Sequence, residues 1–97
     1  MYRQGDLLFV QVTNIPTEAI EQKDGIIAKG EITGHMHRIQ QQQKAMLMIA
    51  AGIAYIKALQ ETEIVHEEHN TIILPPGEWE VRRQQEYEPS GWRQVVD

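Results

Sequence analysis

The sequence predicts an all-β protein, a small sandwich or barrel of about six to eight short strands. Three observations support this prediction. Runs of β-branched and aromatic residues recur along the chain, glycine, proline and asparagine separate them, and no segment clearly predicts a long helix. With 97 residues, the chain is expected to form a single β domain over 1–97 with one core.

The first quarter of the chain predicts one strand, a connection and a turn. Leu7 to Val12 is apolar on both faces, which favours a central strand. Asn14-Ile15-Pro16 ends it, because proline has no N–H to donate to a ladder. Thr17 to Lys23 is polar and is expected to form a loop or one helical turn, and Asp24-Gly25 predicts a tight turn.

The next segment is predicted to be extended over residues 26–33. If the extension continued through Ile39, the two-residue period of a strand would place His35, His37 and Ile39 on one face. The glutamines at 40–43 then predict a solvated connection, with the start of a helix as the alternative.

Lys44 to Leu59 is compatible with either a helix or a hairpin. Its alanine, methionine and leucine content favours a helix by intrinsic propensity. Gly52 opposes that, because glycine inside a helix costs about 1 kcal/mol relative to alanine. We therefore predict a hairpin, with strands at Met46 to Ala50 and Ile53 to Leu59 around Ala51-Gly52.

The last third of the chain alternates short strands with turns. Asn70 to Leu74 is β-branched and predicts a strand, and Pro75-Pro76-Gly77 predicts a turn. Trp79 to Tyr87 alternates between a partly apolar and a polar face, as a half-buried strand does. Pro89-Ser90-Gly91 breaks the chain again, and Trp92 to Val96 predicts a last short strand.

All four histidines fall into two close pairs, His35 and His37 in H-x-H and His66 and His69 in H-x-x-H. A strand with H-x-H delivers two imidazoles to one side, whereas the second pair converges only if His66-Glu67-Glu68-His69 bends. Neutral imidazole suits zinc, iron and nickel. We therefore predict a divalent metal site (Zn, Fe or Ni) formed by His35, His37, His66 and His69.

Glu67 and Glu68 have several roles open to them at such a site. Either could be a carboxylate ligand, an acceptor for an imidazole N–H or a general base. The chain has no Ser-His-Asp order, no phosphate-binding loop and no H-E-x-x-H motif. Whether the protein is an enzyme therefore stays open, and no catalytic residue is predicted.

The histidines also have plainer interpretations. His35 and His37 could form hydrogen bonds across a sheet or at a subunit interface, and His66 and His69 could lie in an exposed turn. Four nearby imidazoles beside two carboxylates could also form a pH-sensitive cluster. The alternative function is thus a non-catalytic, self-assembling or partner-docking β module with structural histidines.

Composition limits the partners and the location of the protein. Fourteen acidic against nine basic residues give a net charge of −5, so we expect no nucleic-acid partner. No cysteine is present, which leaves nitrogen and oxygen as metal ligands and fits a cytoplasmic protein. The longest apolar run, Ala45 to Ile56, is too short to cross a bilayer. A monomer of this size buries only about two-thirds of its unfolded surface, so we expect a homo-oligomer.

Four blocks of the sequence, YRQGD, TGHMHRI, HEEH and LPPGEWEVRRQQEY, resemble a set of small uncharacterised bacterial and phage-associated proteins in which similar blocks recur in this order. The resemblance covers nearly the whole chain. It implies an architecture with a hairpin turn at Ala50-Ala51-Gly52, and it implies no activity.

The H-x-H pair is also distantly similar to the first motif of the cupin barrel, at His35 and His37. The chain departs from the cupin pattern at Gln41 or Gln42 in place of glutamate, at Gly30 one residue out of register, and after Pro75-Pro76-Gly77, where no histidine follows. No cupin activity is carried over to this chain.

Overall fold

Twelve strands and one short 3-10 helix make up the computed structural model, which describes residues 1–29, 34–83, 85–88 and 91–94. In chain order they are β1 (Tyr2–Gln4), β2 (Leu7–Val12), β3 (Ile20–Glu21), β4 (Ile26–Lys29), β5 (Met36–Ile39), η1 (Gln42–Lys44), β6 (Ala45–Ala50), β7 (Ile53–Ala58), β8 (Thr62–Val65), β9 (Ile72–Leu74), β10 (Gly77–Arg83), β11 (Gln85–Glu88) and β12 (Gly91–Gln94).

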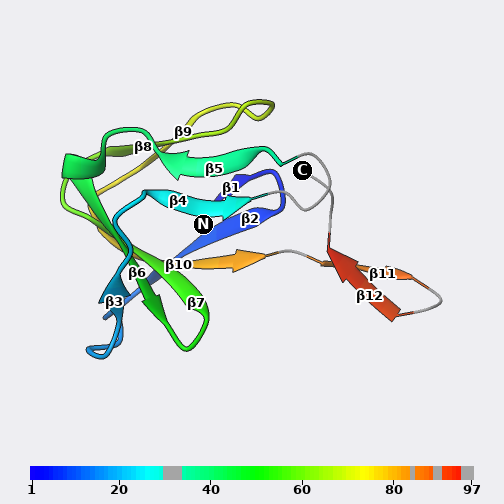
Figure 1. Cartoon of the computed structure of the whole chain (residues 1–97), viewed down its shortest axis with the longest axis horizontal. Helices are drawn as coiled ribbons and strands as arrows, with labels where there is room; N and C mark the ends of the chain where they lie inside the picture. The colour runs from blue at the N-terminus through cyan, green and yellow to red at the C-terminus, as the bar shows by residue number, and fades with distance from the viewer. Residues whose placement is uncertain (30–33, 84, 89–90, 95–97) are drawn as a thin grey trace.

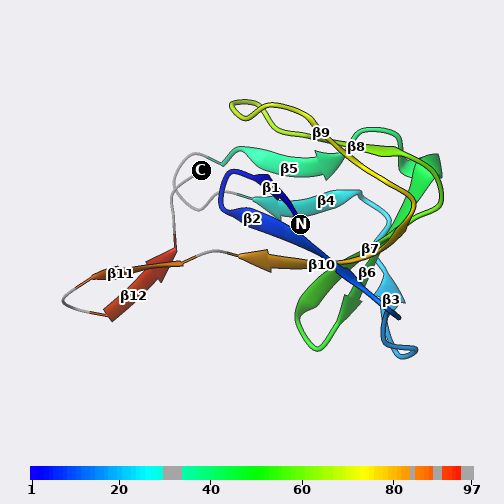
Figure 2. The ribbon, with the colours of Figure 1, turned by 180° about the vertical axis from the view of Figure 1, so that it is seen from behind.

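The predicted all-β class is confirmed, and the strands are arranged in two main antiparallel sheets. A six-stranded sheet has the order β1-β2-β10-β7-β6-β3, and a four-stranded sheet has the order β4-β5-β8-β9. The two sheets face each other across one core (Figure 1). The β11–β12 pair forms a third sheet, which extends away from the other two in both ribbon views (Figure 1, Figure 2).

The apolar core lies between the two main sheets. The six-stranded sheet contributes Leu7, Phe9, Ala45, Leu47, Ile56, Ala58 and Trp79, and the four-stranded sheet contributes Ile39, Ile64 and Leu74. Full burial of one large aliphatic or aromatic side chain stabilises the folded state by about 1.5–3 kcal/mol. This part of the interior is therefore the main source of stability.

The hairpin predicted within Lys44 to Leu59 is confirmed. β6 and β7 pair antiparallel, and Ala50 lies opposite Ile53, so Ala51-Gly52 forms the two-residue connection. Both connecting residues have positive φ angles, 50° and 76°. A two-residue turn of type I′ needs this backbone, which glycine adopts readily and which is incompatible with a continuous helix.

The conditional expectation of one strand running through to Ile39 is wrong. β4 and β5 are antiparallel neighbours with Ala28 opposite His37, so the chain reverses between them, and Gly34 has a positive φ of 76°. Alternation alone does not distinguish a long strand from two strands of a hairpin. Within β5, the expectation that His37 and Ile39 lie on the same face is correct, because both side chains are buried.

The structure has more strands than the six to eight that were predicted, because several of its strands are very short. The predicted loop at Thr17 to Lys23 contains β3, and the glutamine run at 40–43 is an exposed connection, as predicted, that ends in the three-residue 3-10 helix η1. Both elements are too short to give a periodic signal. The predicted strand from Trp79 to Tyr87 is divided into β10 and β11.

Some predicted features fall outside the described residues. These are the extension at 30–33, the proline break at 89–90 and the strand end at 95–96. Within the described ranges, no helix is long and apolar enough to span a membrane.

Candidate functional site

The two histidine motifs lie opposite each other because β5 and β8 are antiparallel neighbours. Their ladder pairs Arg38 with Val65. One step further in the same register, His37 lies opposite His66, and their ring centroids are 4.3 Å apart. Strand pairing therefore brings together two histidines that are far apart in the sequence.

Beyond the end of β8, the side chains of two glutamates make further contacts between the two motifs. The backbone N–H of Met36 donates to Glu67 Oε2 at 2.9 Å, and His35 Nδ1 lies 3.3 Å from Glu68 Oε1. The hydrogen bond from Met36 lowers the pKa of Glu67, with smaller contributions from its own backbone and from His66 and His35. The glutamates thus connect the HEEH segment to the H-x-H segment, and the Glu68 carboxylate lies beside the His35 imidazole.

The bend predicted at HEEH is confirmed. His66 Nδ1 accepts hydrogen bonds from the backbone N–H groups of Glu68, at 3.0 Å, and His69, at 3.3 Å. The bend brings the His69 ring to 4.5 Å from the His66 ring and 6.1 Å from the His37 ring. Because Nδ1 accepts, the proton of a neutral His66 ring is on Nε2.

Gln4 of β1 fixes the orientation of His37. Its side-chain Nε2 donates to the carbonyl oxygens of Ile64, at 2.8 Å, and Asn70, at 2.9 Å. Since this end of the amide must be the NH2 group, Oε1 is the atom that lies 2.9 Å from His37 Nδ1. Oε1 can only accept, so His37 Nδ1 carries a proton.

Asp6 lies on the other side of the His37 ring. Its Oδ1 is 3.5 Å from His37 Nε2, and both side chains have 0% exposed surface. Its Oδ2 is 3.4 Å from Arg83 Nη1. Asp6 reaches this position from the β1–β2 turn, where Gly5 has a positive φ of 58°, as the first central residue of a type II′ turn does.

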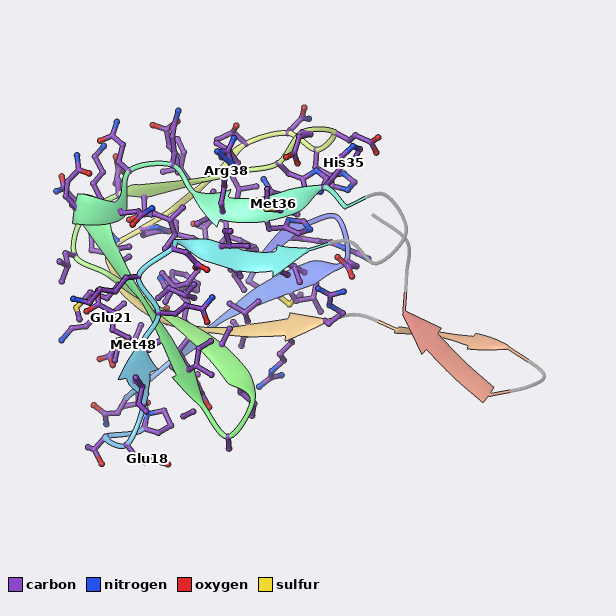
Figure 3. The ribbon with its side chains drawn as sticks, in the orientation of Figure 1. Glu18, Glu21, His35, Met36, Arg38 and Met48 are labelled. Carbon is purple, nitrogen blue, oxygen red and sulfur yellow. The ribbon has the colours of Figure 1, made fainter. Side chains whose placement is uncertain are left out.

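The cluster extends from the protein interior to the surface. His37 is fully buried and His66 is 9% exposed. The side chains of His35 and Glu68 are 30% and 54% exposed, and Figure 3 shows His35 beside the loop between β8 and β9. His35 and Glu68 therefore form the exposed rim of the cluster.

The four predicted metal ligands, His35, His37, His66 and His69, all contribute rings to this cluster; the His35 ring is 5.7 Å from that of His66. However, no three histidine, aspartate or glutamate side chains in the described parts of the chain are arranged to hold a metal ion. His66 Nδ1 is directed toward its own turn by the hydrogen bonds that it accepts there.

Gln4 and Asp6 were not among the predicted site residues. Each of them contacts His37, from which it is separated by more than thirty residues in the sequence. A Gly-Asp pair between two short strands ordinarily marks an exposed turn, so neither residue type nor spacing signals a buried carboxylate. Only the packing of the β1–β2 hairpin against β5 reveals it.

Comparison with known proteins identifies a family and no function. Neither a search of curated proteins nor a search of solved structures found a match to this chain. The distant cupin resemblance therefore stays a prediction. A family model described as "Domain of unknown function (DUF8820)" matches residues 3–84, which include the histidine cluster, Gln4 and Asp6. The chain belongs to this domain family of unknown function.

Proposed function

We propose that this protein binds one divalent metal ion, Zn²⁺, Fe²⁺ or Ni²⁺, through at least three of the histidines His35, His37, His66 and His69. The observation that carries the proposal is the spacing of the rings: four of the ring pairs have centroid separations from 4.3 to 6.1 Å. Two imidazoles that bind one ion through nitrogens at about 2.0–2.1 Å have ring centres on the order of 5 Å apart. The separations are therefore in the range that shared binding of one ion requires, and binding would need the rings to rotate toward the ion.

One of the rings, that of His37, already has the hydrogen bonding of a metal ligand, and the His35 ring lies beside a carboxylate. A metal-bound imidazole usually donates its other N–H to a carboxylate or carbonyl oxygen, which fixes the ring and its tautomer. His37 Nδ1 donates to Gln4 Oε1, so Nε2 is its ligand atom. His35 Nδ1 faces the Glu68 carboxylate, which assigns Nε2 of His35 to the same role.

His66 and His69 differ in what metal binding would require of them. His69 is held near the cluster by the HEEH bend, and its Nε2 is buried there. His66 uses Nδ1 as an acceptor, so it becomes a ligand only by giving up those hydrogen bonds or the proton on Nε2. We expect His35, His37 and His69 to be the minimum set, with His66 as the residue that shapes the bend.

The test is metal content and affinity in protein prepared without an affinity tag. After chelator treatment and titration with Zn²⁺, we expect one tight site per chain, weakened at least tenfold by His35→Ala and His69→Ala. Arg38→Ala is the matched control, because Arg38 is an exposed residue of β5 outside the cluster (Figure 3). Equal metal affinity in the wild type, the histidine variants and the control would contradict the proposal.

The role of the ion is then decided by a second measurement. A bound ion of this kind either holds two strands together or activates a water molecule. Any ion that the folded state binds tightly raises the melting temperature by the linkage of binding to folding, so the deciding measurement is the circular dichroism of the metal-free protein. Loss of the folded spectrum without the ion is expected for a structural ion, whereas a metal-free protein that stays folded would favour chemistry at the ion.

As a second candidate we propose a self-associating module that forms a homo-oligomer. The supporting observation is a groove of about 590 Å³ beside β4, which is an edge strand of the four-stranded sheet. Its lining includes Ile27, Ile53 and Val81, and Ile53 is 39% exposed. Exposed sheet edges next to apolar surface favour the addition of a strand from another chain.

Sedimentation at several protein concentrations tests this second candidate. We expect a concentration-dependent oligomer that chelator does not dissociate and that Ile53→Glu weakens. Leu59→Glu is the control, because Leu59 is exposed and does not line the groove. A monomer at every concentration would contradict self-association.

A further inference from the structure

We infer that Asp6 is a ligand of the ion, through Oδ1, so that the site combines imidazole nitrogens with one buried carboxylate oxygen. The inference rests on the proposed metal binding and adds a residue to it. It gives the site one negative charge and makes Asp6 a determinant of which cation is taken.

The first step is the identity of the atoms that face each other. Gln4 fixes the proton of His37 on Nδ1, so the neutral ring presents a lone pair at Nε2. The atom 3.5 Å from Nε2 is Asp6 Oδ1, which is also an acceptor when the carboxyl is ionised. Two acceptors at this separation repel each other unless a cation lies with them, either a proton on His37 or a metal ion.

The second step is burial. Both side chains have 0% exposed surface, so water does not screen the carboxylate. The cost of burying an ion in a protein interior is on the order of several kcal/mol unless it is paired with an opposite charge. Arg83 supplies opposite charge at Oδ2, and a divalent cation shared by Asp6 Oδ1 and His37 Nε2 would add to it on the other side of the carboxylate.

The third step is the different surroundings of the two carboxylate oxygens. Oδ2 faces Arg83 Nη1 at 3.4 Å, whereas Oδ1 faces His37. The arginine holds the carboxylate plane and balances part of its charge. Asp6 is therefore oriented to bind an ion through a single oxygen, as a neighbour of the His37 ligand atom.

The ligand set determines the class of cation. Imidazole nitrogen with carboxylate oxygen suits divalent zinc, iron and nickel, whereas monovalent copper prefers sulfur ligands. The uncharged histidines alone would discriminate less strongly against monovalent copper. We therefore expect the site to prefer Zn²⁺ to Cu⁺, and to lose part of this preference when Asp6 is neutralised.

The experiment compares Asp6→Asn with Asp24→Asn in the full chain, with Zn²⁺ as the probe. Asp24 is a fully exposed turn residue, so its variant removes the same charge far from the cluster. We expect Asp6→Asn to weaken Zn²⁺ affinity at least tenfold and Asp24→Asn to change it less than twofold. Equal affinities in Asp6→Asn and the wild type would overturn the inference while leaving the histidine proposal intact.

A measurement on the wild-type protein covers the case in which Asp6→Asn does not fold. The side-chain carboxyl carbon of each aspartate gives its own NMR signal, and we expect the Asp6 signal to shift during a stoichiometric Zn²⁺ titration while that of Asp24 stays in place. Tight binding with an unshifted Asp6 signal would overturn the ligand role. Absence of Zn²⁺ binding in the wild type would instead overturn the proposed function itself.

Discussion

The interior between the two sheets has an apolar region and a polar region, and the same strands supply both. The inward positions change from Ile64 in β8 to His66 just after it, and along β5 they change from Ile39 to His37. Asp6 is also buried, but it lies in the β1–β2 turn directly before the buried Leu7 of β2. Strand periodicity therefore buries whatever residue falls on the inward position, and residue identity decides whether that part of the interior is apolar or polar.

The two regions are stabilised by different interactions. The apolar side chains are stabilised by removal of their surface from water, and this hydrophobic contribution needs no directional contacts. The polar side chains offset their loss of hydration through specific contacts, such as those of Gln4 with His37, Ile64 and Asn70. A typical hydrogen bond contributes a net of about 0.5–1.5 kcal/mol, so the polar region adds little stability for its degree of burial. This is why we assign function to it.

The largest expected effect belongs to the apolar region. Ile64 is fully buried in β8, and Ile64→Ala is expected to lower the free energy of unfolding by about 2–5 kcal/mol, since it removes buried methyl groups and leaves a cavity. Ile73→Ala is the control in the adjacent strand β9, where the side chain is 52% exposed, and should cost less than about 1 kcal/mol. Urea unfolding followed by circular dichroism measures both. Similar losses in the two variants would contradict the assignment of the core.

A smaller loss of stability is expected at Gln4, whose side chain joins the polar region to the backbone of Ile64 in the apolar region. Gln4→Leu keeps the side chain bulky but leaves the acceptors at Ile64 and Asn70 without its amide, which is expected to cost about 1–3 kcal/mol. Gln40→Leu, at an exposed position, is the control. Urea unfolding measures both, and the His37 ring signals in ¹⁵N NMR should change only in the Gln4 variant. An unchanged His37 tautomer would contradict the role given to Gln4.

The smallest effect is expected at the exposed rim of the polar region. Hydrogen bonding from Met36 lowers the pKa of Glu67 below its ordinary value of 4.5. The folded state thus binds a proton at Glu67 less readily than the unfolded state does. The ionised Glu67 side chain therefore stabilises the folded state. This contribution is complete above pH 4.5, the ordinary pKa, and is lost as the pH falls through the lowered pKa of Glu67 in the folded state.

Replacement of Glu67 by glutamine tests this pH dependence. We expect wild type and Glu67→Gln to differ in stability near pH 6 and to converge in acid, because both side chains are then uncharged. Glu61→Gln, at an exposed position, serves as the control for loss of one charge. A difference between wild type and Glu67→Gln that is the same at pH 6 and in acid would show that the Met36 contact does not depend on the carboxylate charge.

Much of the fold was predictable because its signals are local. The hairpin at Ala51-Gly52 follows from a glycine between two apolar runs of equal length, and Asp24-Gly25 marks a turn that the structure also has. The bend at HEEH was expected as a condition for the two histidines to converge. Predictions failed where local patterns are ambiguous, as in the reversal between β4 and β5.

The sequence by itself determined the all-β class, the hairpin between β6 and β7 and which histidines to consider, because hydrophobic period and turn chemistry involve residues close together in the chain. Only the tertiary structure decided that His37 faces His66, that Gln4 fixes the His37 tautomer and that Asp6 is buried beside it. These contacts depend on strand register and sheet packing across long loops. Their energies arise between residues whose proximity no local pattern encodes.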